Sequence, residues 1–197
     1  MVLLGRAART RQQAQAILDD LGLLEKWRRF GRPVLVGAVS FDLAVAPDID
    51  MEVYCPELRV EHGFQILTEC ATNPRVIAAQ FLNALSSPDK ALYWQLRYRT
   101  DDGTEWKIDM WSAPQDYDLP RGEDFVQPMK KSLTDETRQA ILALKEARAE
   151  GCWPTFLSVD LYRAVLDGGV RTVSGMQQWL QSNEVGVLTD WRPGKSR

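Results

Sequence analysis

The spacing of apolar residues changes along the chain, and these changes predict where helices and strands lie. Between residues 7 and 29 apolar residues recur at steps of three and four, the period of an amphipathic helix, which Gly31 and Pro33 end. Residues 34–36 form a short apolar run, and after a loop or single helical turn residues 48–55 alternate between apolar and polar. We therefore predict one helix followed by two strands.

The middle of the chain combines a helical stretch with a hairpin. Residues 61–83 are predicted to form a helix in two pieces, because Pro74 disfavours helix just before it and favours a new first turn. Residues 91–100 and 104–112 alternate on either side of a short turn that contains Asp and Gly. This pattern predicts a β-hairpin, and we expect its Trp and Tyr side chains to lie in the core.

Burial predicts the register of this hairpin. Pairing Thr100 with Thr104 across a three-residue loop separates apolar from polar side chains, whereas a slip of one residue would mix the two faces. The same separation holds in the earlier strand, where Asp48, Asp50 and Glu52 face one way. We expect helices to cover the apolar face and the acidic face to form the floor of a cleft, with Glu52 a solvated strand residue.

The rest of the chain is predicted to be helical after a long connection. Residues 113–131 are rich in Pro and Asp and are expected to form that connection. Thr134 is a good N-cap for a helix over residues 135–150, which Gly151 ends. Two shorter helices are expected near residues 154–167 and 174–182.

Length and composition fit a single globular protein. With 197 residues, 45% of them hydrophobic and 26% charged, the chain is long enough to build a core without disulfides or a structural metal. The predicted fold class is α+β, a mixed sheet with helices on one face plus C-terminal helices. We expect an α/β domain over residues 1–131 and a helical segment over residues 132–197 packed on it.

Charge and hydropathy limit the partners that we expect. The formal net charge of −3 disfavours a protein that coats nucleic acid, because such binding neutralises phosphates with Lys and Arg. No apolar run reaches the roughly 18 residues of a membrane span, and the first residues lack a signal-peptide pattern. We therefore expect no nucleic-acid or membrane partner and a cytoplasmic location, and the sequence leaves the oligomeric state open.

Carboxylates are the main candidates for chemistry in this chain. Its single histidine, His62, argues against a Ser-His-Asp hydrolase or a multi-histidine metal site. Asp48 and Asp50 are separated by one residue, so their side chains point the same way about 6.5 to 7 Å apart along a strand, which suits a shared divalent cation. Asp109, on a second predicted strand, is a third acid in a similar setting.

These residues resemble the motif of the nucleotidyltransferase superfamily, which has the polymerase-beta-like fold. That motif is a strand ending in Gly-Ser, then Asp-x-Asp on the next strand after about nine residues, and a third Asp on a later strand. Here Gly37-Ala38 is followed at that distance by Asp48-Ile49-Asp50, and Asp109 lies between apolar neighbours. The resemblance covers roughly the stretch from the first predicted strand to the end of the hairpin.

The resemblance implies transfer of a nucleoside monophosphate from a nucleoside triphosphate (NTP) to a hydroxyl of a small-molecule or protein acceptor. The three aspartates would hold Mg²⁺, two ions being expected, and Asp109 would also accept the proton of the attacking hydroxyl. Gly37 would let the backbone approach the phosphates. Ala38 stands where the family carries Ser, and Ser40 is near enough to replace that hydroxyl.

Three alternatives stay open at this level. Ala38 supports a catalytically degenerate domain that binds nucleotide or a partner protein. Asp48 and Asp50 are also compatible with a haloacid-dehalogenase-like phosphatase if residues 43–46 form a buried strand that precedes them. A helix-turn-helix over residues 158–181 is disfavoured, because its second helix would carry no basic residue for phosphate contacts.

Overall fold

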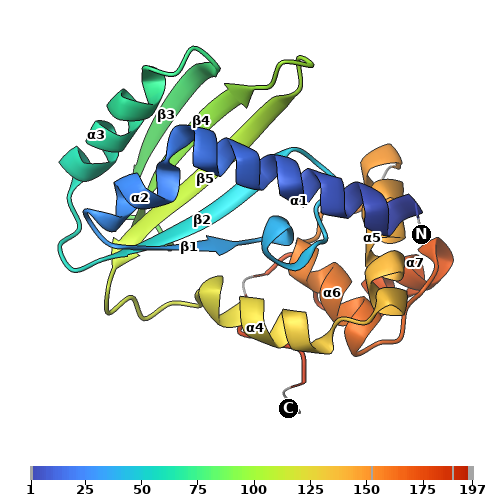
Figure 1. Ribbon diagram of the computed structural model, residues 1–197. Coiled ribbons are helices and arrows are strands. Elements are labelled where there is room, and N and C mark those ends of the chain that lie inside the picture. Colours follow the sequence, from blue (N-terminus) through green and yellow to red (C-terminus); the bar gives the residue numbers. More distant parts are fainter. Residues whose placement is uncertain (1, 152, 188, 195–197) are drawn as a thin grey trace.

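Five strands form one mixed sheet in the computed structural model, which describes residues 2–151, 153–187 and 189–194 (Figure 1). The strands are β1 (Arg32–Val36), β2 (Asp48–Cys55), β3 (Val76–Ala84), β4 (Ala91–Arg99) and β5 (Glu105–Pro114). Their order across the sheet is β1-β2-β5-β4-β3, with β2 parallel to β5 and the other neighbours antiparallel. This arrangement confirms the predicted α+β class with a mixed sheet.

Helices lie before, between and after these strands. They are α1 (Val2–Leu21), α2 (Leu23–Arg28), the 3₁₀ turn η1 (Ala38–Phe41), α3 (Val60–Ala71), α4 (Glu123–Ser132), α5 (Asp135–Glu150), α6 (Ser158–Leu166) and α7 (Val173–Ser182). Among the described residues, none of these helices has the length and apolar character needed to cross a membrane.

The predicted apolar face of the sheet is covered by α1, α2 and α3 (Figure 1). Apolar side chains of β2, β4 and β5 pack there against Leu18, Trp27 and Ile66 from the three helices. Helix α3 approaches closely at Gly63, where an added Cβ would lie 2.2 Å from the indole of Trp94. This side of the sheet therefore forms the main core.

The hairpin has the predicted register. Thr100 N donates to Thr104 O at 3.0 Å, and Leu96 pairs with Ile108. Gln95 lies opposite Asp109 on the other face. Burial of one face was therefore sufficient to predict the pairing.

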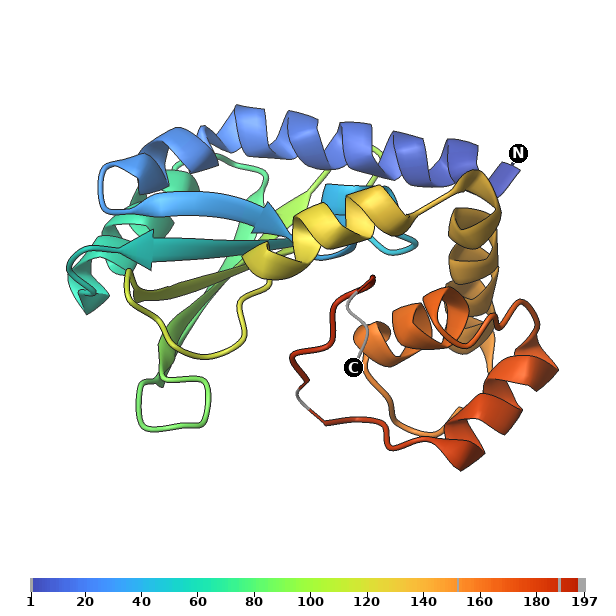
Figure 2. The same ribbon diagram turned by 90° about the horizontal axis from the view of Figure 1, so that it is seen from below.

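The helices after the sheet gather at one end of it, as seen from below in Figure 2. A second apolar core joins α5, α6 and α7 with residues from earlier in the chain, among them Ala7 of α1, Phe41 of η1 and Leu43 shortly after it. Helix α4 ends at Ser132, next to the predicted boundary between residues 1–131 and 132–197. That division stays a prediction, since this core contains side chains from both parts.

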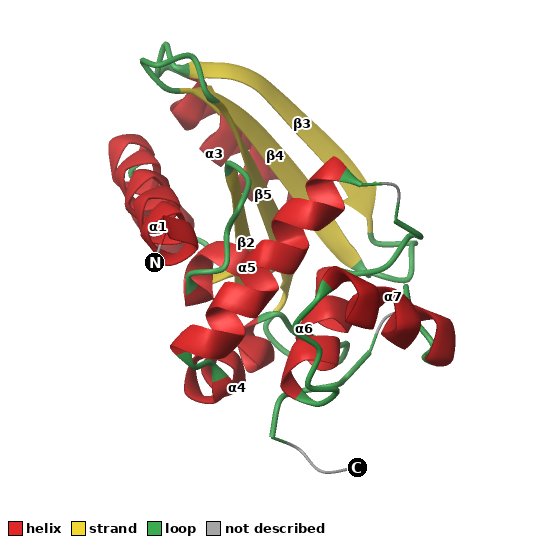
Figure 3. Cartoon of the chain, turned by 90° about the vertical axis from the view of Figure 1, so that its right-hand side faces the viewer, coloured by secondary structure: helices red, strands yellow, loops and turns green. Residues whose placement is uncertain are grey.

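Two predictions of secondary structure are wrong. Residues 76–84 form edge strand β3 rather than the second piece of a helix (Figure 3). Pairing with β4 decides this segment, because tertiary contacts readily override the weak helix preference of its alanines. Residues 123–131, expected as part of the connection, lie in α4, where the backbone amides at its start donate to a carboxylate on the sheet.

The boundaries of other helices also differ from those expected. The predicted helix over residues 7–29 begins earlier and divides at Gly22, which has φ 56°. Helix α6 begins at Ser158 rather than near residue 154. The phosphatase alternative needs a strand at residues 43–46, and the structure has none there.

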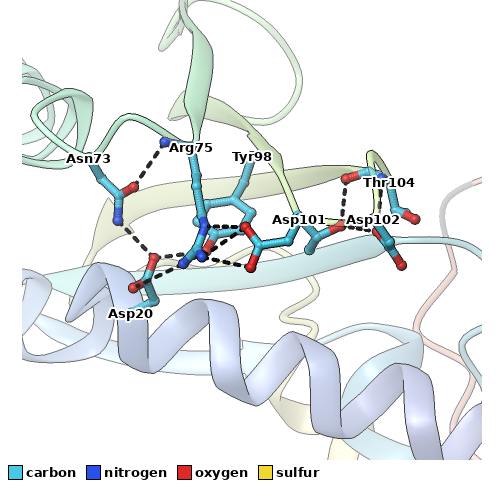
Figure 4. A network of polar contacts seen from close by, with 8 residues as sticks. Asp20, Asn73, Arg75, Tyr98, Asp101, Asp102 and Thr104 are labelled. Atoms are coloured by element: carbon cyan, nitrogen blue, oxygen red, sulfur yellow. Dashed lines mark hydrogen bonds and ion pairs between the residues drawn. The ribbon is translucent and has the colours of Figure 1, made fainter.

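A polar network fixes the start of β3 against α1 and the hairpin turn (Figure 4). Arg75 donates to both carboxylate oxygens of Asp101 at 2.9 Å. Asp20, near the end of α1, accepts hydrogen bonds from Asn73 at 2.7 Å and from the Tyr98 hydroxyl at 2.8 Å. The three segments are thereby connected although they lie far apart in the sequence.

Candidate functional site

The three predicted aspartates meet on the polar face of the sheet. Because β2 and β5 are parallel neighbours, Asp50 lies directly opposite Asp109, and Asp48 lies opposite Lys107. One carboxylate oxygen from each aspartate lies within 4.8 Å of the other two. The sheet therefore brings together the three acids that the sequence singled out.

The acids disfavour one another's charge. Burial, followed by the charges of Asp48 and Asp109, raises the pKa of Asp50 to about 7. Burial also raises the pKa of Asp48, against the opposing charge of Lys107. A cluster of carboxylates such as this one is stabilised by any cation that binds between them.

Lys107 is the cation nearest to the acids among the described residues. Its Nζ lies 2.7 Å from Asp109 Oδ2 and 3.3 Å from Asp48 Oδ1. Burial opposes its charge, but the hydrogen bond to Asp109 and the two carboxylate charges raise the pKa of Lys107 overall. Asp48 Oδ1 is buried, and its contact with Lys107 is an ion pair without good hydrogen-bond geometry.

Asp109 is oriented by two neutral side chains of β4. The Tyr93 hydroxyl donates to Asp109 Oδ1 at 2.7 Å, and Gln95 Nε2 donates to the same oxygen at 3.1 Å. Burial, together with this hydrogen bond, raises the pKa of Tyr93 to about 12, so the phenol stays a donor at neutral pH. With Oδ1 held from β4 and Oδ2 turned towards Lys107, the carboxylate has one defined orientation.

Tyr93 is also a correction to the predicted core. We expected the hairpin aromatics to be buried, as Trp94 and Trp106 are, but Tyr93 and Trp111 lie half-buried on the acidic face, where their rings pack 4.8 Å apart. The alternation of the hairpin already placed Tyr93 on the face of Gln95. The burial predicted for Tyr93 followed from its aromatic ring, whereas its position in the alternating strand places it on the acidic face.

The turn after β1 approaches the acids closely. Gly37 has φ 66°, and a Cβ there would lie 2.1 Å from Asp50 Oδ2, so only glycine fits. Gly37 and Ala38 both line a cleft beside Asp48 and Asp50. The Ser40 hydroxyl instead donates to the Gly37 carbonyl at 2.8 Å, and Ser40 is buried rather than among the residues lining the cleft beside the acids.

A cleft of about 350 Å³ opens between the acids and the C-terminal helices. Asp48 and Asp50 lie on one side of it, and Lys145 of α5 and Tyr162 of α6 lie on the other. Lys145 Nζ donates to the Leu43 carbonyl at 2.9 Å and lies 3.3 Å from the Tyr162 hydroxyl. Burial lowers the pKa of Lys145 to about 8, although the charge of Asp50 opposes this effect.

The sequence did not point to Lys145 or Tyr162. Both lie on helices far from the acidic motif along the chain, and neither belongs to a spaced motif of its own. Helical period places a residue on a face of its helix, but it does not say which face meets the sheet. Packing of α5 and α6 is what brings the two side chains into the cleft.

Glu52 was predicted to be a solvated strand residue, but it is half-buried and holds the start of α4. Its carboxylate accepts from the backbone amides of Gly122 at 2.7 Å and Glu123 at 3.0 Å, at the N-terminus of α4. The Tyr54 hydroxyl donates to it as well. Glu52 therefore attaches α4 to the acidic face.

No protein-family model and no curated protein matches this chain. Among solved structures, a mutant of the Cid1 poly(U) polymerase bound to MgATP matches with a TM-score of 0.60 and 17% identity, covering 80% of this chain and 50% of that chain. A cytoplasmic RNA terminal U-transferase matches at 0.59 and 16%, covering 80% and 48%. Cid1 bound to MgGTP matches at 0.59 and 17%, covering 80% and 50%.

These matches show the fold. The chain has the polymerase-beta-like nucleotidyltransferase fold, as its acidic motif indicated, and it spans about half the length of the solved structures that it matches.

Proposed function

We propose that this protein transfers a nucleoside monophosphate from an NTP to a hydroxyl of a small-molecule or protein acceptor, with Mg²⁺ at Asp48, Asp50 and Asp109. The observation that carries the proposal is the meeting of three carboxylates within 4.8 Å, two of which, Asp48 and Asp50, line a cleft. The carboxylate oxygens of the three aspartates already attract the ammonium group of Lys107, and they fit a site for a hard cation, because Mg²⁺ prefers oxygen ligands. We propose two ions, as in the family that the motif resembles.

Each residue has a part in this proposal. Bound Mg²⁺ would neutralise the phosphates and the charge that develops on the leaving pyrophosphate. Asp109, held by Tyr93 and Gln95, accepts the proton of the acceptor hydroxyl. Gly37 and Ala38 present backbone on the wall of the cleft, where the phosphates would lie.

The proposed substrates rest on the matched structures and on the charge of the chain. MgATP and MgGTP are bound by the matched Cid1 structures, which supports an NTP as donor here. The net charge of −3 supports a small-molecule or protein acceptor over RNA, although one matched protein is an RNA terminal U-transferase. The choice between these acceptors is therefore part of the test.

A second candidate function is nucleotide binding without transfer, and the position of Ser40 favours it. The hydroxyl that was expected to replace the missing Ser at Ala38 is directed to the Gly37 carbonyl. In this case Asp48 and Asp50 would still bind a metal nucleotide, but no acceptor would react.

Radiolabelled transfer distinguishes the two functions. The protein is incubated with Mg²⁺ and each α-labelled NTP, together with pooled small metabolites, pooled proteins or a short RNA, and pyrophosphate release is measured alongside label transfer. We expect label on an acceptor, abolished separately by Asp48→Asn, Asp50→Asn and Asp109→Asn. Transfer that persists in Asp50→Asn would refute the proposal, and tight binding of a nonhydrolysable NTP without transfer would favour the second candidate.

A further inference from the structure

The sheet has one protected edge and one open edge. At the protected edge β1 has only five residues, begins with Arg32 and Pro33, and has α4 packed against it. At the other edge β3 is nine residues long and pairs only with β4 (Figure 3). Within the described part of the chain, no segment pairs with its outer side.

Strand β3 has a β-bulge at Ile77, near its start, but lacks the other features with which proteins block an exposed edge. The segment from Val76 to Ala84 contains no charged residue, no proline and no glycine. Edge strands in soluble proteins are normally short, charged, interrupted by proline or covered, because their free amides and carbonyls otherwise pair with another strand. The backbone amides and carbonyls on the outer side of β3 are therefore free to pair with another strand.

Exposed apolar side chains gather around the same edge. Ile77 and Leu82 on β3 are 39% and 52% exposed, and Leu85 follows at 46%. Phe64 of α3, which packs on Phe81, is 47% exposed. Four of the large hydrophobic side chains that the described residues expose thus lie on β3, just after it or on the helix behind it.

We propose that β3 pairs with β3 of a second copy of this chain, antiparallel and centred on Gln80. Beyond the bulge at Ile77 the strand is uncharged and regular, so it is its own complement in this arrangement, since a two-fold axis at Gln80 matches each free amide with a free carbonyl. Gln80 is the middle residue of β3, so Gln80 of one copy lies opposite Gln80 of the other. The two sheets join into one of ten strands.

The contact area is adequate for a specific dimer. Nine residues of strand extend about 30 Å, and a sheet with a helix behind it is about 20 Å deep, so each copy contributes about 600 Å². Two copies bury about 1,200 Å², the lower end of the range for specific interfaces. A reversible dimer is therefore expected rather than an obligate one.

The dimer leaves both acidic sites accessible. A two-fold axis perpendicular to the sheet keeps the acidic faces of both copies on the same side, and β4 and β5 lie between each β3 and its acids. This proposal is therefore independent of nucleotidyl transfer and is tested without substrates.

A charge-exchange experiment on the full chain tests both the surface and its register. Sedimentation velocity is expected to show a concentration-dependent species of twice the 22.4 kDa monomer mass. Gln80→Lys and Gln80→Glu each place like charges opposite one another and are expected to raise the dissociation constant about fivefold or more, and mixing the two variants restores association. Gln139→Lys, on the exposed side of α5, is the matched control and leaves the dimer intact.

Hydrogen exchange supplies a test that does not depend on variants. In the wild-type protein, amides of residues 76–84 become more protected as the concentration rises, while circular dichroism confirms that the Gln80 variants are folded. A protein that stays monomeric at every concentration would overturn the proposal. A dimer that Gln80→Lys leaves unchanged, without added protection in β3, would also overturn it.

Discussion

Replacing Asp50 with asparagine should stabilise the metal-free protein at high pH. The unfolded chain ionises Asp50 near its ordinary pKa of 3.8, whereas the folded site raises that pKa to about 7. Between these values the folded state binds more protons than the unfolded state, so this group lowers stability as pH rises and its full cost is reached above pH 7. Below pH 3.8 the aspartic acid is neutral in both states and costs nothing.

The pKa values set the magnitude. A change from 3.8 to about 7 corresponds to at most about 4 kcal/mol of unfolding free energy, at about 1.36 kcal/mol for each pKa unit. The asparagine side chain would carry no charge, so Asp50→Asn should raise the melting temperature at pH 8 by up to about 8 to 16 °C for a chain of this size. At pH 4 the variant and the wild-type protein should differ little.

Thermal and urea unfolding in EDTA across pH 4 to 8 measures this effect. Asp116→Asn, which removes an exposed acid from a loop, is the matched control and should not reproduce the pH dependence. Addition of Mg²⁺ at pH 8 should stabilise the wild-type protein more than Asp50→Asn, because the ion removes the repulsion. The electrostatic account of the site would be refuted if the stability gained by Asp50→Asn over wild type were no larger at pH 8 than at pH 4.

Three further substitutions test other parts of the site. Gly37→Ala would place a Cβ 2.1 Å from Asp50 Oδ2 in a left-handed conformation, so calorimetry should show loss of Mg²⁺ binding together with a lower melting temperature. Tyr93→Phe should weaken Mg²⁺ binding about tenfold by releasing Asp109, with the fold intact by circular dichroism; unchanged affinity would count against the orienting role. Glu52→Gln should cost about 1 to 2 kcal/mol in urea unfolding, since the amides of α4 lose a charged acceptor, and an unchanged midpoint would contradict this.

Several features of the fold were accessible from local pattern. The hairpin register followed from burial alone, and the acid-containing strand could be placed because a period of two is unambiguous over eight residues. Thr134 was correctly identified as the N-cap of α5, where its side chain accepts from the amide of Thr137. In each case the interactions that decide the structure lie within a few residues of one another or within one hairpin.

Features that depend on distant contacts were missed. Residues 76–84 carry a mixed pattern, and only pairing with β4 makes them a strand. Helix α4 depends on Glu52, whose partner amides lie far along the chain. The position of Lys145 in the cleft was missed for a similar reason, because it depends on how α5 packs and not on the residues that flank Lys145 in the sequence.

The parallel pairing of β2 with β5 also has a consequence for how the protein folds. Asp50 and Asp109 come from strands separated by α3, β3 and β4, so the cation site is absent until the central strands of the sheet have joined. Such non-local pairing is slow to form, because the chain loses the entropy of closing a long loop before any stabilising contact is made. The moment at which Mg²⁺ binds during refolding would therefore report when β2 and β5 have paired. Isolated fragments that carry only one of these strands would lack the site.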